Sequence, residues 1–140
     1  MDKRELSVGN WIWRPDCYDQ VVEIRSDGII GIDEGVGVIP FEDIKPIPIY
    51  GETLERNGFH KEFDGILECD QYVSEDGRVI LNNDERFLNS MKHWSIHVDN
   101  ASFCSIGSCE IDSIHELQGF LLQCGIEPDI SMFRRKEGEA

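Results

Sequence analysis

Short stretches of alternating apolar and polar residues run through most of the chain, and this period of two is typical of half-buried β-strands. The clearest stretch is residues 92–98, in which Trp94 and Ile96 alternate with polar side chains. Shorter stretches of similar character are found at residues 11–13, 20–25, 29–32, 66–73, 78–81, 103–106 and 109–111. Glycine accepts the positive φ of a tight turn, so Gly28 and Gly77 predict hairpins between successive strands.

The pattern changes to a helical period near the end of the chain. Apolar residues three or four positions apart form one stripe there, consisting of Ile114, Leu117, Leu121 and Cys124. Ser113 and Glu116 have the spacing of a capping box, which predicts the start of this helix, and Gly125 predicts its end. A shorter helix is predicted at residues 52–57, where Gly58 supplies a left-handed stop.

Three prolines mark a connector between two parts of the chain. Pro40, Pro46 and Pro48 each remove a backbone donor and hold the preceding residue extended, so this segment is not a central strand. We expect three parts, a small β lobe at 1–49, an α+β lobe at 50–129 and a frayed tail at 130–140. The predicted fold class is α+β, with a small N-terminal SH3-like β meander or barrel followed by an antiparallel sheet, a short middle helix and a C-terminal helix.

The chain is strongly acidic. Its 140 residues include 28 Asp and Glu against 13 Lys and Arg, which gives a formal net charge of −15. Phosphate backbones and anionic lipids would repel such a surface, so we expect neither nucleic acid nor a membrane among its partners. No apolar run approaches the roughly 18 residues that cross a bilayer, and no signal segment follows Met1, so we expect a cytoplasmic protein.

The spacing of cysteine and histidine argues against a structural metal or a bound cofactor. The five cysteines are scattered, odd in number and without a Cys-x-x-Cys pair, so we expect free thiols and no zinc site. His93 and His97 are four residues apart, but on a strand about 13 Å separates two such Cα atoms, too far to ligate one ion. Both histidines are expected to face solvent.

Two histidines keep a catalytic alternative open. His115 lies beside Glu116 near a helix N-terminus, where the helix dipole disfavours a charged imidazole, and His93 is the other candidate base. The sequence contains no Gly-x-Ser-x-Gly elbow, no phosphate-binding glycine loop and no ordered Ser-His-Asp set, which argues against an enzyme without deciding the question. A cleft that joins one of these histidines to a carboxylate would support a small hydrolase.

Three further residues are candidates for a partner surface or a structural anchor. The helical angle places Gln118 within the apolar stripe, where a buried amide needs hydrogen-bond partners. It either ties the helix to a sheet edge or loop carbonyl, or belongs to a face left open for a partner chain. Trp11 and Trp13 point to the same side of their strand, either into the core of the small barrel or onto a peptide-binding platform.

Four short segments carry a resemblance that spans most of the chain. They are LSVGNWI at 6–12, IKPIPI at 44–49, NGF at 57–59 and IHELQ at 114–118. Together they resemble an uncharacterised family from Bacteroidales genomes, many members of which are carried on prophages and mobile elements. That family reads L-x-I-G-N at its opening, P-I-P-L-T-E-E-W-L-x-x-F-G-F in the middle and V-H-x-L-Q-N-L in its closing helix. The chain departs from this pattern at Tyr50, Thr53 and Gly119, and the resemblance implies no activity.

These observations favour a non-enzymatic interaction or accessory protein of a phage or mobile element, with the acidic surface contacting a protein partner. Two alternatives remain. One is an acidic inhibitor, such as a nuclease immunity factor or DNA mimic, which predicts a single face dense in carboxylates. The other is the small hydrolase that uses His93 or His115. The identity of the partner and the oligomeric state do not follow from the sequence.

Overall fold

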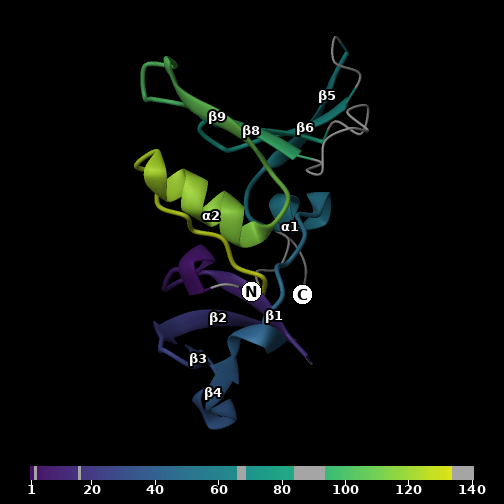
Figure 1. The fold of residues 1–140 in the computed structure, drawn as a ribbon. Helices are drawn as coiled ribbons and strands as arrows, with labels where there is room; N and C mark the ends of the chain where they lie inside the picture. The colour runs from purple at the N-terminus through teal and green to yellow at the C-terminus, as the bar shows by residue number, and fades with distance from the viewer. Residues whose placement is uncertain (2, 16, 66–68, 84–93, 134–140) are drawn as a thin grey trace.

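The computed structural model describes residues 1, 3–15, 17–65, 69–83 and 94–133. Within them the chain forms two antiparallel sheets (Figure 1). The first has the order β1-β2-β3-β4, with strands β1 (Trp11–Arg14), β2 (Cys17–Ile24), β3 (Gly28–Gly31) and β4 (Val38–Pro40). The second has the order β5-β6-β7-β8-β9, with strands β5 (His60–Asp64), β6 (Cys69–Val73), β7 (Val79–Asn83), β8 (Trp94–Asp99) and β9 (Ser105–Ile111). The helices are α1 (Gly51–Arg56), α2 (Ile114–Gln123) and the short 3-10 helices η1 (Lys3–Glu5), η2 (Glu34–Val36) and η3 (Phe41–Asp43).

This architecture confirms the predicted α+β class with antiparallel sheets. The first sheet is an open meander, because β1 and β4 do not pair with each other within the described residues. The meander order is therefore confirmed. Just after η3, Lys45 forms an antiparallel bridge with Trp13, so the chain that follows β4 returns to β1.

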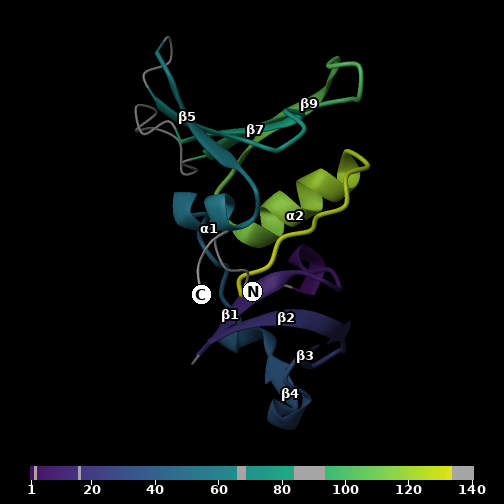
Figure 2. The ribbon, with the colours of Figure 1, turned by 180° about the vertical axis from the view of Figure 1, so that it is seen from behind.

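Helix α2 lies between the two sheets, beneath β8 and β9 and above β1, as both ribbon views show (Figures 1 and 2). Its buried stripe of Ile114, Leu117 and Leu121 joins the inward side chains of the five-stranded sheet in the larger hydrophobic core. The smaller core lies within the first sheet, where Ile12 and Ile29 are fully buried. The chain thus has two cores, and α2 is the element that holds the sheets together.

Strand β1 faces both cores because successive side chains of a strand point to opposite sides. Ile12 belongs to the small core, whereas Trp11 belongs to the larger one. The expectation that Trp11 fills the core of the small lobe is therefore wrong. Its ring lies on the face of β1 that is turned toward α2.

The end of the described chain is packed and not frayed. Ile130 is buried, the Asn57 side chain bonds both backbone groups of Ser131, and the ring of Phe133 meets Trp11 edge-on at 5.0 Å. Residues 130–133 therefore correct the predicted tail. Residues 134–140 lie outside the described part of the chain.

The predicted helices are confirmed, but the capping box at the start of α2 is not formed as expected. The hydroxyl of Ser113 donates to the Glu116 carboxylate at 2.9 Å and makes no cap bond to a backbone amide. The first helical N–H, that of Ile114, donates to the carbonyl of Ile47 at 2.8 Å. The carbonyl of Ile47, in the proline connector, therefore accepts from a first-turn N–H of α2, whereas the Ser113 side chain was expected to bond such an amide.

Two strands were missed by the sequence pattern, the short edge strand β4, which ends at Pro40, and β5. Strand β5 has no alternation because nearly all of its residues, His60-Lys61-Glu62-Phe63-Asp64, are polar or charged. It forms by pairing with β6 at the edge of the sheet, in the register His60 with Val73. The predicted irregularity near Gly107 is present as a register shift between the Val98–Gly107 and Asp99–Ser105 pairs.

Candidate functional site

Gln118 connects the last helix to the first strand. The side chain is only 3% exposed; its Oε1 accepts the Trp11 N–H at 2.8 Å, and its Nε2 donates to the Gly9 carbonyl at 2.9 Å. The amide thus mimics a peptide group at the edge of β1. Both the oxygen and the nitrogen of the Gln118 amide form a hydrogen bond inside the fold, which is a structural role.

The two predicted tryptophans lie in different environments. Trp11 is buried, and within the described residues its Nε1 is the one buried side-chain nitrogen or oxygen without a hydrogen-bond partner. Trp13 is 36% exposed and packs edge-on against Tyr18 at 4.9 Å. Together they do not form an open aromatic platform, because only Trp13 reaches the surface.

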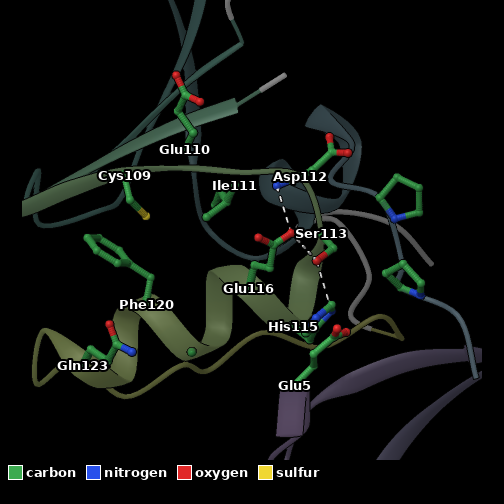
Figure 3. Close-up of a pocket in the computed structure, with 13 residues that line it drawn as sticks. Glu5, Cys109, Glu110, Ile111, Asp112, Ser113, His115, Glu116, Phe120 and Gln123 are labelled. Atoms are coloured by element: carbon green, nitrogen blue, oxygen red, sulfur yellow. Dashed lines mark hydrogen bonds between the residues drawn. The ribbon is translucent and has the colours of Figure 1, made fainter. Parts of the chain in front are cut away.

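A groove of 680 Å³ runs between β9 and α2 (Figure 3). Residues 109–112 form its upper wall, α2 forms its lower wall, and Pro46, Pro48 and Glu5 close it at one end. Cys109 and Phe120 point toward each other across it, and their half-buried side chains make its interior apolar. We regard this groove as the candidate site.

The upper wall of the groove is an edge strand. β9 pairs with β8 on one side and is last in the order of its sheet. Just beyond its end, the connector already uses the same edge. The Ile49 N–H donates to the Asp112 carbonyl at 3.2 Å, and Pro48 forms an antiparallel bridge with Ser113.

A polar cluster lies at the closed end of the groove. Ser113 Oγ is 2.9 Å from Glu116 Oε1 and 3.0 Å from His115 Nδ1. Because the single hydroxyl proton goes to Glu116, a hydrogen bond with His115 requires the imidazole proton to be on Nδ1. Ser113 is only 4% exposed, so its hydroxyl orients neighbouring side chains and is poorly placed to attack a substrate.

The lining of the groove is acidic. Its lining includes the carboxylates of Glu5, Glu110, Asp112 and Glu116, whereas no lysine or arginine is among the described residues that line it. Figure 3 shows Glu5 and Glu116 on the side of α2 and Glu110 pointing away from that helix. Groups of one sign around an apolar interior favour a ligand with apolar and cationic parts.

A second hollow, of 1010 Å³, lies between the end of α1, the β6–β7 turn and the segment after α2. Its lining mixes Arg56 and Lys61 with several acidic residues. Its charged lining residues are of both signs, and no residue of β9 lines it. It therefore does not indicate a class of ligand as the groove does.

The remaining predicted histidine sites do not come together. His97 Nε2 is 2.7 Å from Asp99 Oδ1 on β8, and the His97 side chain is 39% exposed. His93 lies outside the described residues. Within the described part of the chain, no group of three or more His, Cys, Asp or Glu could hold a metal ion, and all five cysteines are free thiols.

Two groups outside the lining of the groove have shifted pKa values. Burial raises the pKa of Tyr72, whose ring packs beside Trp94 in the larger core. Hydrogen bonds from the Arg78 N–H and the Ser74 hydroxyl lower the pKa of Asp76 in the β6–β7 turn. Both shifts have structural causes and do not mark a catalytic centre.

The groove could not be read from the sequence, because its walls come from η1, the proline connector, β9 and α2. The one sequence signal near it is the run Ser105-Ile106-Gly107-Ser108-Cys109, which has no charge in a strongly acidic chain. Among the described residues, no helix is long and apolar enough to cross a bilayer. Comparisons with protein-family models, with curated proteins and with solved structures find no match to this chain.

Proposed function

We propose that this chain is a non-enzymatic interaction protein that binds a protein partner in the groove between β9 and α2. The observation that carries the proposal is the combination of an edge strand, an apolar interior and an acidic lining that has no lysine or arginine among the described residues. Edge strands above a groove are a recurrent mode of binding other chains. The resemblance to a mobile-element family supports an accessory role for such a protein in a phage or mobile element.

Site-specific photocrosslinking in the native host tests the proposal. A benzophenone amino acid at Gln123 lies on the exposed rim of the groove, and one at Val22, on the outside of the first sheet, is the matched control. We expect a discrete crosslinked product from position 123 and not from position 22.

A blocking substitution makes the test specific for the groove. A side chain built on Gly119 meets no atom within 4 Å at its Cβ, so Gly119→Trp fills the groove without a clash at that atom. Leu122→Trp changes an exposed residue of the same helix and serves as its control. Loss of the product with Gly119→Trp but not with Leu122→Trp supports the proposal, and equal products from both variants contradict it.

The identity of the crosslinked partner separates two versions of this function. An acidic inhibitor would give a nuclease as the product, with its basic surface in the groove. A subunit or regulator encoded by the same element would indicate the accessory role.

A small hydrolase is the second candidate, because the groove joins His115 to the Glu116 carboxylate through Ser113. It would use His115 as the general base toward a substrate in the groove. Hydrolysis of a panel of p-nitrophenyl esters that is abolished by His115→Ala would support it. Equal activity in the wild type and the variant would count against it.

A further inference from the structure

We infer that the partner enters the groove as an extended segment bearing lysine or arginine, and that this segment pairs with β9 as a sixth strand of the sheet. The inference rests on the proposed function and specifies the chemistry of the partner. It combines three features, which are an unprotected edge, an internal precedent for strand addition and the sign of the charge.

Apart from the register shift between the Val98–Gly107 and Asp99–Ser105 pairs near its start, the edge of β9 lacks the devices that usually protect edge strands. Such strands are typically short, charged, interrupted by proline or covered. The other edge of the same sheet, β5, is rich in charge, and the outer strand β4 has three residues and ends in Pro40. By contrast, β9 has seven residues, no proline and a single charged residue, Glu110.

The molecule already adds an extended segment along the continuation of this edge. The Ile49 N–H donates to the Asp112 carbonyl, and the Ile114 N–H donates to the Ile47 carbonyl. This short ladder does not extend further, because the chain turns into α1 at Gly51. The connector therefore shows that the edge accepts an antiparallel neighbour, and it ends where β9 begins to offer its own length.

The acidic lining of the groove indicates what charge the added strand should carry. Alternate side chains of an added strand would point toward α2, where they would meet Glu116 and Glu5. A cationic side chain is attracted there and an acidic one is repelled. A second copy of this chain would bring a further net charge of −15, so a basic segment of a different protein is the better occupant.

Selection from a displayed library of random octapeptides, with the purified full chain at 150 mM salt, tests the inference. We expect enriched peptides to combine β-branched residues with lysine or arginine. Replacing the enriched lysine or arginine of a selected peptide by norleucine should weaken its binding to the chain at least about tenfold. N-methylation should weaken binding at alternate amides only, because alternate amides of an added strand face β9.

The basic residue, the strand pairing and the binding site are tested by separate outcomes. Enriched peptides without a basic residue, or peptides that bind equally after N-methylation at every position, overturn the inference and leave the groove as a binding site. Tight peptides that ignore Gly119→Trp contradict the proposed function itself. A library that yields no peptide dependent on the groove also overturns the inference.

Two other occupants are distinguishable. A dimer in light scattering that Gly119→Trp abolishes would assign the groove to a second copy. Peptide affinity that rises at least about tenfold when the chain ends at Phe133 would assign it to the chain's own Arg134-Arg135-Lys136 run. Either result would overturn the choice of a separate basic partner.

Discussion

At the scale of single residues, buried polar groups hold this fold in place where they find partners. Asp19 is 3% exposed, and its carboxylate accepts hydrogen bonds from the Arg14 side chain and from the N–H groups of Gln20 and Ile32. The buried Gln118 side chain likewise links α2 to the segment around β1, because it accepts from the Trp11 N–H and donates to the Gly9 carbonyl. A polar side chain that is buried in this way is costly to replace, because its partners are left behind without hydrogen bonds.

Gln118→Leu tests this directly. The variant keeps an apolar side chain of similar length but removes the acceptor of the Trp11 N–H, so we expect a loss of about 1–3 kcal/mol in the free energy of unfolding. Gln123→Leu, five residues further along α2 and exposed, should change the free energy of unfolding by less than about 0.5 kcal/mol. Urea melts of both variants make the comparison, and a neutral Gln118→Leu would show that the tie contributes nothing.

Asp76 gives a prediction for pH. Its pKa is lowered in the folded chain from its usual 3.8, chiefly by the Arg78 N–H, so the charged form is stabilised by folding. Its contribution is fully present above the unfolded pKa and is lost as the pH falls through the folded pKa. An NMR titration should give a midpoint below 3.8 for this carboxyl.

The matching variant is Asp76→Asn. The difference in stability between wild type and variant should be constant near neutral pH and should shrink as the solution is acidified through and below the usual carboxyl range. A difference that grows on acidification would contradict the lowered pKa.

At the scale of elements, α2 holds the two sheets together. It buries Ile114 and Leu117 completely in the larger core while its Gln118 reaches β1. The same helix presents Gly119 and Gln123 to the groove. The buried stripe and the proposed binding surface therefore lie on different faces of one helix, so we expect that stability and binding can be changed independently.

Leu117→Ala should cost roughly 2–5 kcal/mol in the free energy of unfolding, because it leaves a cavity in the middle of the buried stripe. His115→Ala removes a half-buried ring at the surface of α2 that contacts the Ser113 hydroxyl, and it should cost less than about 1 kcal/mol. Chemical denaturation of the two variants provides the measurement. Equal losses would mean that His115 has a larger structural role than its position indicates.

At the scale of the whole molecule, charge and free thiols set the expected behaviour. The chain has a net charge of −15, its cysteines form no disulfide, and its described residues contain no group of three or more side chains suited to a metal. These properties lead to two predictions that involve no substitution.

Chelator and reductant should leave the melting temperature unchanged. Neither a metal ion nor a disulfide is expected to contribute to the free energy of unfolding. A fall of more than about 4 °C, which corresponds to about 1 kcal/mol for a domain of this size, would reveal such a contribution.

Duplex DNA of random sequence should not bind at 150 mM salt, because a surface of this charge repels the phosphate backbone. Fluorescence anisotropy with a labelled duplex is the measurement, and a basic DNA-binding protein serves as positive control. A micromolar dissociation constant would be incompatible with the proposed role of the acidic groove.

The sequence by itself determined the features that depend on neighbouring residues. Both helices, with Gly58 and Gly125 in positive φ just beyond their ends, follow from local periodicity and stop signals. The hairpin turn at Gly77, which has positive φ, follows in the same way, as does the antiparallel character of the sheets. The hairpin between β2 and β3 also forms, but Gly28 lies in β3 without positive φ, where a side chain would collide with the Ile39 carbonyl. Steric limits on φ and the pairing of adjacent strands act over a few residues, so they can be read from the chain in order.

The tertiary structure alone decided what depends on distant partners. Polar β5 became a strand because β6 was available to pair with it, and Trp11 joined the larger core because α2 covers that face of β1. The groove exists only because residues near positions 5, 47, 110 and 116 meet in space. Burial and hydrogen bonding between such distant segments depend on how the whole chain packs, and no local pattern encodes that packing.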